Sequence, residues 1–445
     1  MLKLFFSRLW KLMEESHPEK LLLFGYLFYT TIGWIFLLLP AAQKVPIPSL
    51  DNFFTAISAI STTGLTTVDT GTSYTFFGQL VILILIQMGG IGYATFASFV
   101  VLSTTKQLSK LRTKVSVHSF SLPSGFVIHE FINHVILYTL ICETIGAISL
   151  SFFFYSHNVK DAIWEAIFHS ISAFCTAGFS LFSTSFEIYR DDFWVNLILS
   201  VLSILGAMGF IVWIDLYKRI IGQKSQTTFT TRIIVSVTFW FLLIGTFLFF
   251  QSTTFQENLP LYEKIMIAFF QTMTASTTVG FNTMNIGTLS YAAITLLLFL
   301  MAFGASPSGT GGGLKSTTFS ALLGLVKSTL RGKNEVTFWN HAIPQRRLLL
   351  ATSSLAYYMF VMATSIYILT LVEDKPFLPL FFEASSALST IGLSMGITSQ
   401  LTDVGKIMII LLMLMGRVGI LTFGVAISIS NKAKIKPHEE NDLVF

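Results

Sequence analysis

Charged side chains are scarce in this chain. Asp, Glu, Lys and Arg together make up 11% of its 445 residues, whereas 53% are hydrophobic. Soluble globular domains carry about 25% charged residues, so the composition excludes a soluble enzyme and indicates a protein that crosses a membrane several times. Cysteine is also rare. Only Cys142 and Cys175 are present, both in apolar surroundings, and they support neither a disulfide framework nor a metal site.

Long hydrophobic stretches are abundant instead. A bilayer-spanning helix needs about 20 apolar residues, and no apolar core with a cleavage site precedes Leu21, so we expect the first span to stay attached. The predicted fold class is an all-α polytopic membrane protein with eight spans in the lipid bilayer. The spans are predicted at residues 21–39, 79–101, 132–154, 195–216, 233–250, 291–303 (continuing past a break), 348–371 and 406–429.

Basic residues gather on alternate connections, as the positive-inside rule requires of cytoplasmic segments. Both termini should then be cytoplasmic. The net charge of +5 follows from this topology and not from nucleic-acid binding, which would need a clustered basic face. The basic cytoplasmic positions lie in segments 3–20, 106–114, 218–232, 327–347 and 432–436.

One short pattern occurs four times, in residues 54–65, 168–179, 270–281 and 382–393. Counted back from the glycine near its end, each copy has Phe ten residues before, Ser or Thr six before, Ala five before and Thr two before. A helix too short to span should precede each glycine, and a second span with a glycine kink should follow. These features predict four membrane–pore-loop–membrane repeats around a central pore. The segments are assigned to a cytoplasmic N-terminus (1–20), repeats 21–105, 106–225, 226–335 and 336–430, and a cytoplasmic tail (431–445).

The Thr-x-Gly step of each copy is suited to binding a monovalent cation. Glycine reaches backbone angles that turn successive carbonyl groups towards one axis, and rings of carbonyls replace the hydration shell of such ions. Small residues that only permit close helix packing are the alternative, which four copies in register disfavour. The predicted selectivity filter comprises Thr62, Thr63, Gly64, Thr176, Ala177, Gly178, Thr278, Val279, Gly280, Thr390, Ile391 and Gly392, with potassium expected at the backbone of the four glycines.

On these motifs the chain resembles the Trk/Ktr/HKT superfamily of potassium transporters over residues 20–430, and most of all the membrane subunit of bacterial Ktr systems. The resemblance implies a bacterial plasma-membrane protein. In this family a glycine in all four filters goes with potassium selectivity, whereas a serine in the first goes with sodium, so Gly64 implies potassium. The loops diverge after their single glycine, which implies a short filter with less stringent exclusion of sodium.

The third repeat departs from the others because a run of ten residues interrupts its second span. This run cannot continue an ordinary helix, and its backbone should face a water-filled pore. A polar loop next to a filter is expected to act as a gate, as the corresponding loop does in Ktr-like proteins; a packed helix kink is the alternative. The predicted gating loop comprises Gly304, Ala305, Ser306, Pro307, Ser308, Gly309, Thr310, Gly311, Gly312 and Gly313.

Three charged residues fall at membrane depth, where isolated charges usually face an interior cavity. We expect Arg417 to hold the closed gate through hydrogen bonds to loop carbonyls or hydroxyls, a role that the family resemblance supports. Lys315 either belongs to the gate or snorkels to the cytoplasmic interface. Glu143 is either a hydrogen-bonded packing residue, the favoured interpretation, or a coupling site.

Two segments resemble enzyme motifs but lack the spacing or the residues that those motifs require. His129 and His134 are five residues apart, whereas the two histidines of a zinc-protease helix are four apart. Residues 309–316 lack the glycine that precedes lysine in a phosphate-binding loop. Neither an enzymatic activity nor a bound cofactor is therefore expected.

Partners follow from the resemblance. Ktr-like membrane subunits work as homodimers with a separate cytosolic ring of RCK-type nucleotide-binding subunits, and both partners are implied here. The candidate docking segments are 106–114, 218–224, 327–333 and 432–445, whose basic residues alternatively reflect orientation alone.

The predicted function is potassium uptake down the electrochemical gradient, with sodium dependence left open. A less selective or sodium-selective cation transporter is one alternative. An alternating-access secondary transporter is another, although such folds usually show two related halves and not four units. A membrane-embedded enzyme is the third, and paired catalytic groups for it are not found.

Overall fold

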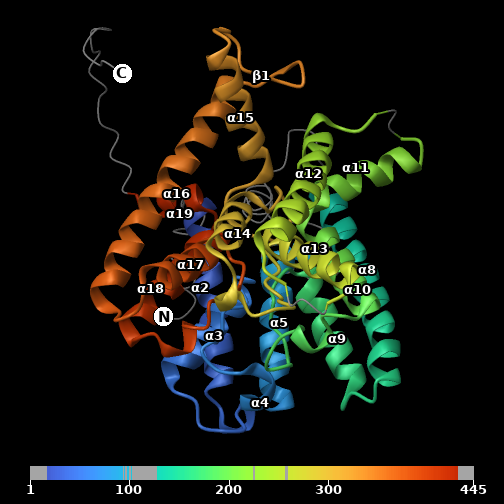
Figure 1. Ribbon diagram of the computed structural model, residues 1–445, viewed down its shortest axis with the longest axis vertical. Helices are drawn as coiled ribbons and strands as arrows, with labels where there is room; N and C mark the ends of the chain where they lie inside the picture. Colours follow the sequence, from blue (N-terminus) through green and yellow to red (C-terminus); the bar gives the residue numbers. More distant parts are fainter. Residues whose placement is uncertain are drawn as a thin grey trace, which may run out of the picture.

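The computed structural model of the chain is helical almost throughout (Figure 1). It describes residues 18–93, 95, 98–99, 102, 128–223, 226–255 and 259–428. The predicted all-α polytopic fold is confirmed. The basic segments 3–17, 106–114 and 432–436 and the tail lie outside the described residues.

Each repeat consists of a long helix, a short helix that ends at the Thr-x-Gly loop, and a second long segment. In the first repeat these are α2 (Pro18–Leu37), α3 (Ser49–Ile60) and α5 (Phe76–Ile91), with η1 (Pro40–Ala42) and α4 (Thr70–Ser73) in the connections. In the second they are α8 (Ile128–Ser156), α9 (Ala162–Phe174) and the pair α10 (Phe193–Ala207) and α11 (Phe210–Ile220), with η2 (Glu187–Tyr189) between.

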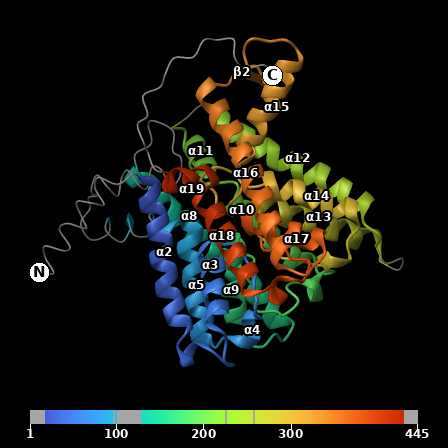
Figure 2. The ribbon, with the colours of Figure 1, turned by 90° about the vertical axis from the view of Figure 1, so that its left-hand side faces the viewer.

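The remaining two repeats follow the same order. The third contains α12 (Phe229–Ser252), α13 (Leu261–Thr277), η3 (Ile286–Thr288), α14 (Tyr291–Phe303) and α15 (Ser316–Leu330). The hairpin of β1 (Thr337–Phe338) and β2 (His341–Ala342) leads to the fourth, with α16 (Gln345–Val372), α17 (Phe377–Leu388), η4 (Thr398–Gln400), α18 (Asp403–Val418) and α19 (Ile420–Ile427). Both views show the hairpin and the adjoining ends of α15 and α16 projecting beyond the other helices (Figures 1 and 2).

The second segment is interrupted in more repeats than the sequence suggests. Helix α5 ends beside Gly92 (φ 82°), α10 and α11 are bent by 93° at Gly209, and α18 and α19 are bent by 105° at Gly419. Glycine adopts these left-handed φ values without a Cβ clash. The second segments are thus interrupted at the glycines where kinks are predicted, but the expectation that only the third repeat breaks this segment is wrong. The third repeat differs in the length of its break, which separates α14 from α15.

The eight predicted spans correspond to four continuous helices and four interrupted segments. Among the described residues, α2, α8, α12 and α16 are each long and apolar enough to cross a membrane, and the bent pairs α10–α11 and α18–α19 are two further spans if each counts as one. Helices α5 and α14 are apolar but shorter, with 16 and 13 residues. Large apolar side chains such as Phe28, Phe152 and Phe360 are exposed on the long helices, which leaves an apolar surface for lipid to cover.

The four repeats pack in a closed cycle. The second segment of each repeat contacts the short helix of the next: α5 contacts α9, α10 contacts α13, α14 contacts α17, and α18 contacts α3. The last contact returns from the fourth repeat to the first, so the repeats surround a common centre. This arrangement encloses the C-terminal ends of the short helices, where the Thr-x-Gly loops begin.

A largely buried ion pair helps to close the cycle. Lys406 at the start of α18 lies with Nζ 2.7 Å from Oδ1 of Asp51 in α3, and the two side chains are only 12% and 9% exposed. Removing one partner of a buried pair leaves an uncompensated charge, whereas removing both can be nearly neutral. The pair therefore ties the fourth repeat to the first.

Replacing Asp51 with Ala should lower the free energy of unfolding by about 3 kcal/mol, because Lys406 remains buried without its partner. Thermal unfolding in detergent measures this as a lower Tm. Lys375, whose bond to Gln400 is exposed, offers the control Lys375→Met, which should change Tm little. A wild-type Tm for Asp51→Ala would show that the pair does not stabilise the closure.

Candidate functional site

The short helices of the first, second and fourth repeats end in the same backbone turn. In the first repeat, the N–H of Thr62 donates to the carbonyl of Ala59 (3.0 Å) and the N–H of Thr63 to that of Ser58 (2.9 Å). The same two bonds recur in the second and fourth repeats. They form a Schellman motif, which satisfies the last carbonyls of a helix and puts the residue after it in the left-handed conformation. That residue is a threonine in all four repeats, with φ 52° at Thr62, 49° at Thr176, 61° at Thr278 and 51° at Thr390.

This conformation is costly for a β-branched residue. Such backbone strain costs about 1–3 kcal/mol per residue and persists only where the surroundings enforce it. Glycine would be the usual residue at this position of the turn. The hydroxyls of Thr62 and Thr176 bind the loop described below, whereas those of Thr278 and Thr390 are buried without a hydrogen-bond partner among the described residues.

The four filter glycines form a ring in which each repeat touches the next. All four have φ between 66° and 93°, and each lies against the carbonyl group of the middle Thr-x-Gly residue of the following repeat. A side chain on any of them would collide with that carbonyl. The pairs are Gly64 with Ala177, Gly178 with Val279, Gly280 with Ile391, and Gly392 with Thr63.

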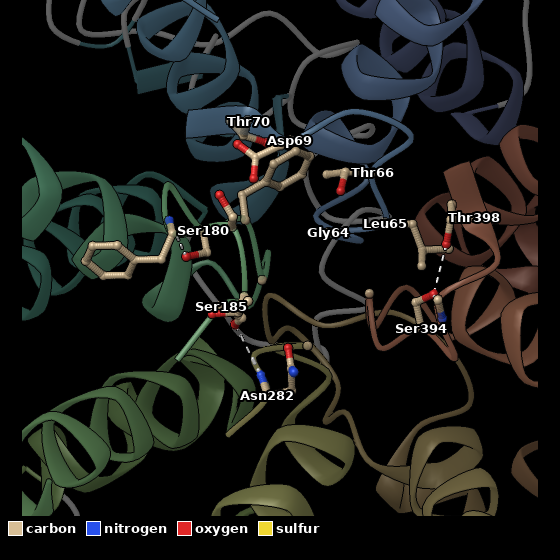
Figure 3. A pocket seen from close by; sticks show the side chains of 18 of the residues that line it. Gly64, Leu65, Thr66, Asp69, Thr70, Ser180, Ser185, Asn282, Ser394 and Thr398 are labelled. Atoms are coloured by element: carbon tan, nitrogen blue, oxygen red, sulfur yellow. Dashed lines mark hydrogen bonds between the residues drawn. The ribbon is translucent and has the colours of Figure 1, made fainter. Parts of the chain in front are cut away.

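On one side of this ring lies a polar cavity of about 480 Å³, which we call the vestibule (Figure 3). All four glycines line it, together with the segments that follow them. Burial raises the pKa of Glu187 in its wall, while the hydrogen bond from the Asn282 amide (2.8 Å) opposes the shift. Hydroxyl, amide and carboxyl groups face the cavity from four repeats, among them Thr66, Asp69, Ser180, Ser185, Asn282, Ser394 and Thr398.

The loop of the third repeat covers the opposite side of the ring. Thr310 is its centre: its hydroxyl lies 2.9 Å from that of Thr176, and its carbonyl accepts from the hydroxyl of Thr62 (3.3 Å). The two glycines after it lie against the remaining left-handed threonines, Gly311 against Thr278 and Gly312 against Thr390. One loop thus contacts all four repeats.

The loop is also fixed to the break in the second repeat. The N–H groups of Ser306 and Thr310 donate to the carbonyls of Ala207 and Gly206 (3.3 and 3.2 Å), and the N–H of Phe210 donates to the carbonyl of Ser308 (3.2 Å). Residues 304–315 therefore form an ordered, hydrogen-bonded connection between α14 and α15. A simple kink in one helix, the alternative considered from the sequence, does not describe it.

Arg417 joins the loop to the first repeat. Its guanidinium donates to the carbonyls of Thr310 and Gly89 and to the Thr62 hydroxyl (2.8 Å). Nε of Arg417 lies 3.4 Å from the Tyr26 hydroxyl. A guanidinium offers five donors in one plane, so one side chain from the fourth repeat binds the first and third together.

Lys315 binds the backbone of the loop. Its Nζ donates to the carbonyl of Gly311 (2.7 Å) and lies 3.4 Å from that of Gly312. Two cations, Lys315 and Arg417, thus bind neighbouring loop carbonyls.

Glu143 lies next to the short helix and the Thr-x-Gly loop of the second repeat. Its carboxylate accepts from the Gln87 amide (3.0 Å) and faces the Cys175 thiol (3.7 Å), while its backbone carbonyl accepts from the Ser170 hydroxyl (2.8 Å). Every one of these partners belongs to the packing around the short helix α9. The arrangement is that of a hydrogen-bonded packing residue.

Two groups in this site were not predicted from the sequence. Tyr26 in the first span and the Gly89 carbonyl both bind Arg417. The sequence predicts a glycine kink in this second span, and the Gly89 carbonyl becomes an acceptor only because the repeats close into a ring. A tyrosine in an apolar helix gives no comparable signal.

Comparison with known proteins agrees with this geometry. Residues 30–436 match the family model for TrkH, described as a cation transport protein. The chain is 33% identical to the Ktr system potassium uptake protein B of Bacillus subtilis, over 94% of this chain and 95% of that protein. It is 31% identical to the potassium/sodium uptake protein NtpJ of Enterococcus hirae, over 93% of each.

A solved structure shares the fold. The crystal structure of the potassium transporter TrkH from Vibrio parahaemolyticus superposes with a TM-score of 0.71 at 21% identity, covering 93% of this chain and 86% of that one. The match extends over all four repeats, as does the family model. The chain therefore belongs to the Trk/Ktr family of potassium and other cation uptake transporters.

Proposed function

We propose that the chain takes up potassium through the ring of four glycines, with the vestibule facing outwards and the loop at residues 304–313 acting as the gate. The observation that carries this proposal is the closed cycle of glycine–carbonyl contacts, because it sets backbone oxygens from four repeats around one axis. An inside-negative potential contributes about 2.3 kcal/mol per charge per 100 mV, which concentrates potassium without ATP hydrolysis.

The selectivity for potassium rests on Gly64 and its three equivalents. A Cβ at Gly64 would press on the Ala177 carbonyl and strain a backbone at φ 89°. A serine there would therefore distort the oxygens expected to replace the hydration shell. The Enterococcus relative is named for both potassium and sodium, so a less selective or sodium-dependent uptake is the second candidate function.

The proposed gate depends on the hydrogen bonds on the side of the ring opposite the vestibule. Thr310 sits against two filter threonines, and Arg417 holds its carbonyl while adding a positive charge near the path of the cation. Hydrogen bonds to charged groups contribute about 1.5–3 kcal/mol each. Opening then requires the loop to leave Arg417 and the threonines together.

Control by a partner is proposed from the family resemblance. The expected partners are a second copy of the chain and a cytosolic ring of RCK-type nucleotide-binding subunits. The segment 327–333 supports a docking role because it ends α15 next to the projecting hairpin (Figure 2). Movement there would reach the gate directly, since α15 begins at Ser316, immediately after Lys315.

Gly64→Ser should lower the preference for potassium over sodium by about tenfold, which corresponds to about 1.4 kcal/mol. Uptake of the two ions is measured in potassium-uptake-deficient cells that express the chain with its cytosolic partner. Ser183, an exposed residue of the vestibule wall, provides the control Ser183→Ala. An unchanged ion preference for Gly64→Ser would contradict the filter, and failure of the unaltered chain to restore growth at low potassium would contradict the function itself.

Arg417→Gln should raise potassium flux by about tenfold in the absence of the cytosolic partner, because the closed gate loses a charge-assisted hydrogen bond. Rubidium flux into liposomes that contain the purified chain measures the effect. The control Arg232→Gln removes an exposed arginine that binds Gln226 and Thr227. Wild-type flux for Arg417→Gln at equal protein content would show that Arg417 does not hold the gate.

A further inference from the structure

One position of the repeat, immediately after its phenylalanine, carries a buried polar residue in every copy. The position lies nine residues before each filter glycine and is occupied by a different residue type each time. None of the four side chains is exposed. They are Thr55, His169, Gln271 and Glu383. A buried polar group needs a hydrogen-bond partner, so the partners of these residues are informative.

In the second repeat the partner is the chain just beyond the filter. Nδ1 of His169 lies 2.8 Å from the Glu165 carbonyl, so it carries the proton and leaves Nε2 as an acceptor. The N–H of Leu181 donates to Nε2 (3.2 Å), and the Ser180 hydroxyl lies 3.0 Å from it. Ser180 and Leu181 are the second and third residues after Gly178.

The third repeat makes the equivalent contact with an amide. Gln271 lies 3.3 Å from the Thr283 hydroxyl. With its amide oxygen turned to satisfy its surroundings, Gln271 accepts from the N–H groups of Thr283 (2.8 Å) and Met284 (3.3 Å). These are the third and fourth residues after Gly280.

The fourth repeat uses a carboxylate. Glu383 accepts from the Thr398 hydroxyl (2.9 Å) and from the Ser394 hydroxyl, and these two hydroxyls lie 3.0 Å apart. Ser394 also accepts from the N–H of Gly396 (2.8 Å). Ser394 and Thr398 both line the vestibule, on the segment that follows Gly392 (Figure 3).

The first repeat shows that this contact is not a requirement of the helix. Thr55 donates to the Asp51 carbonyl of its own helix (2.9 Å). A buried polar side chain at this position can therefore be satisfied locally. The other three residues instead reach a segment that has no regular secondary structure of its own next to the glycine.

We propose that His169, Gln271 and Glu383 are positioning residues that fix the vestibule side of the ring, with Glu383 as the strongest of the three. The inference rests on the proposed function of the ring as a potassium filter. The segment after each glycine is joined to it through that glycine's carbonyl group, so the position of the segment fixes the orientation of the carbonyl oxygen. If the segment shifts, the oxygen moves away from the axis, and the ion loses a ligand that replaces its hydration shell.

Glu383 should contribute most because both of its side-chain oxygens bind the segment, one at Ser394 and the other at Thr398. Ser394 extends the chain of bonds to Gly396. The fourth wall of the vestibule is thus held along its length.

Glu383→Leu should raise KM for potassium by about tenfold and reduce the preference for potassium over sodium, with Vmax largely retained. Glu383→Gln keeps the volume and one acceptor, as Gln271 does in the third repeat, so it should recover most of the affinity. The control is Glu263→Leu on the equivalent helix α13, where the carboxylate binds the Tyr262 hydroxyl. Uptake kinetics at matched membrane abundance provide all of these values.

A second pair of variants tests the same contact from the vestibule. Ser394→Ala with Thr398→Val leaves Glu383 in place and should give the same rise in KM. Adding these changes to Glu383→Leu should have little further effect, because the contact is already lost. If the Glu383→Leu protein does not accumulate in the membrane, the Ser394→Ala, Thr398→Val variant alone tests the inference. Wild-type KM and ion preference in the vestibule pair would overturn the inference, whereas absence of potassium uptake by the unaltered chain would instead overturn the proposed function.

Discussion

The contact between each filter glycine and a carbonyl of the next repeat is the constraint on which the rest of the structure depends. It requires a residue without a side chain at Gly64, Gly178, Gly280 and Gly392, and it requires four short helices to end at one level around one centre. The Schellman turns supply that ending. The packing of each second segment on the next short helix supplies the closure. The ring is therefore a property of all four repeats together and of none alone.

The left-handed threonines connect the symmetric ring to the asymmetric loop that covers one side of it. Their backbone is strained in the same way in every repeat, and their side chains face the side opposite the vestibule. There a single loop from the third repeat contacts all four, while Arg417 from the fourth repeat binds that loop to the first. The chain thus uses a repeated element for the ring and two unique elements for its closure. Residues such as Glu383 add a third layer, at the mouth of the ring.

The sequence predicts the features that repeat, because a pattern seen four times defines its own geometry. The short helix before each glycine and the turn at each glycine follow from this repeated pattern and agree with the structure. The breaks at Gly209 and Gly419 were underestimated, since one glycine permits either a kink or a bend near 90°. The contacts of Arg417, and the way Glu383 reaches Thr398, depend on how distant segments close into a ring. Periodicity and propensity do not encode those distances.

The central claim is that the four glycine loops bind one dehydrated monovalent cation on their common axis. Anomalous scattering from crystals grown with thallium or rubidium tests it most directly. The account predicts an anomalous peak on the axis, within coordination distance of backbone oxygens from all four Thr-x-Gly loops, that disappears in Gly64→Ser. A fully occupied ion elsewhere in the protein, with no peak at the ring, would contradict the account.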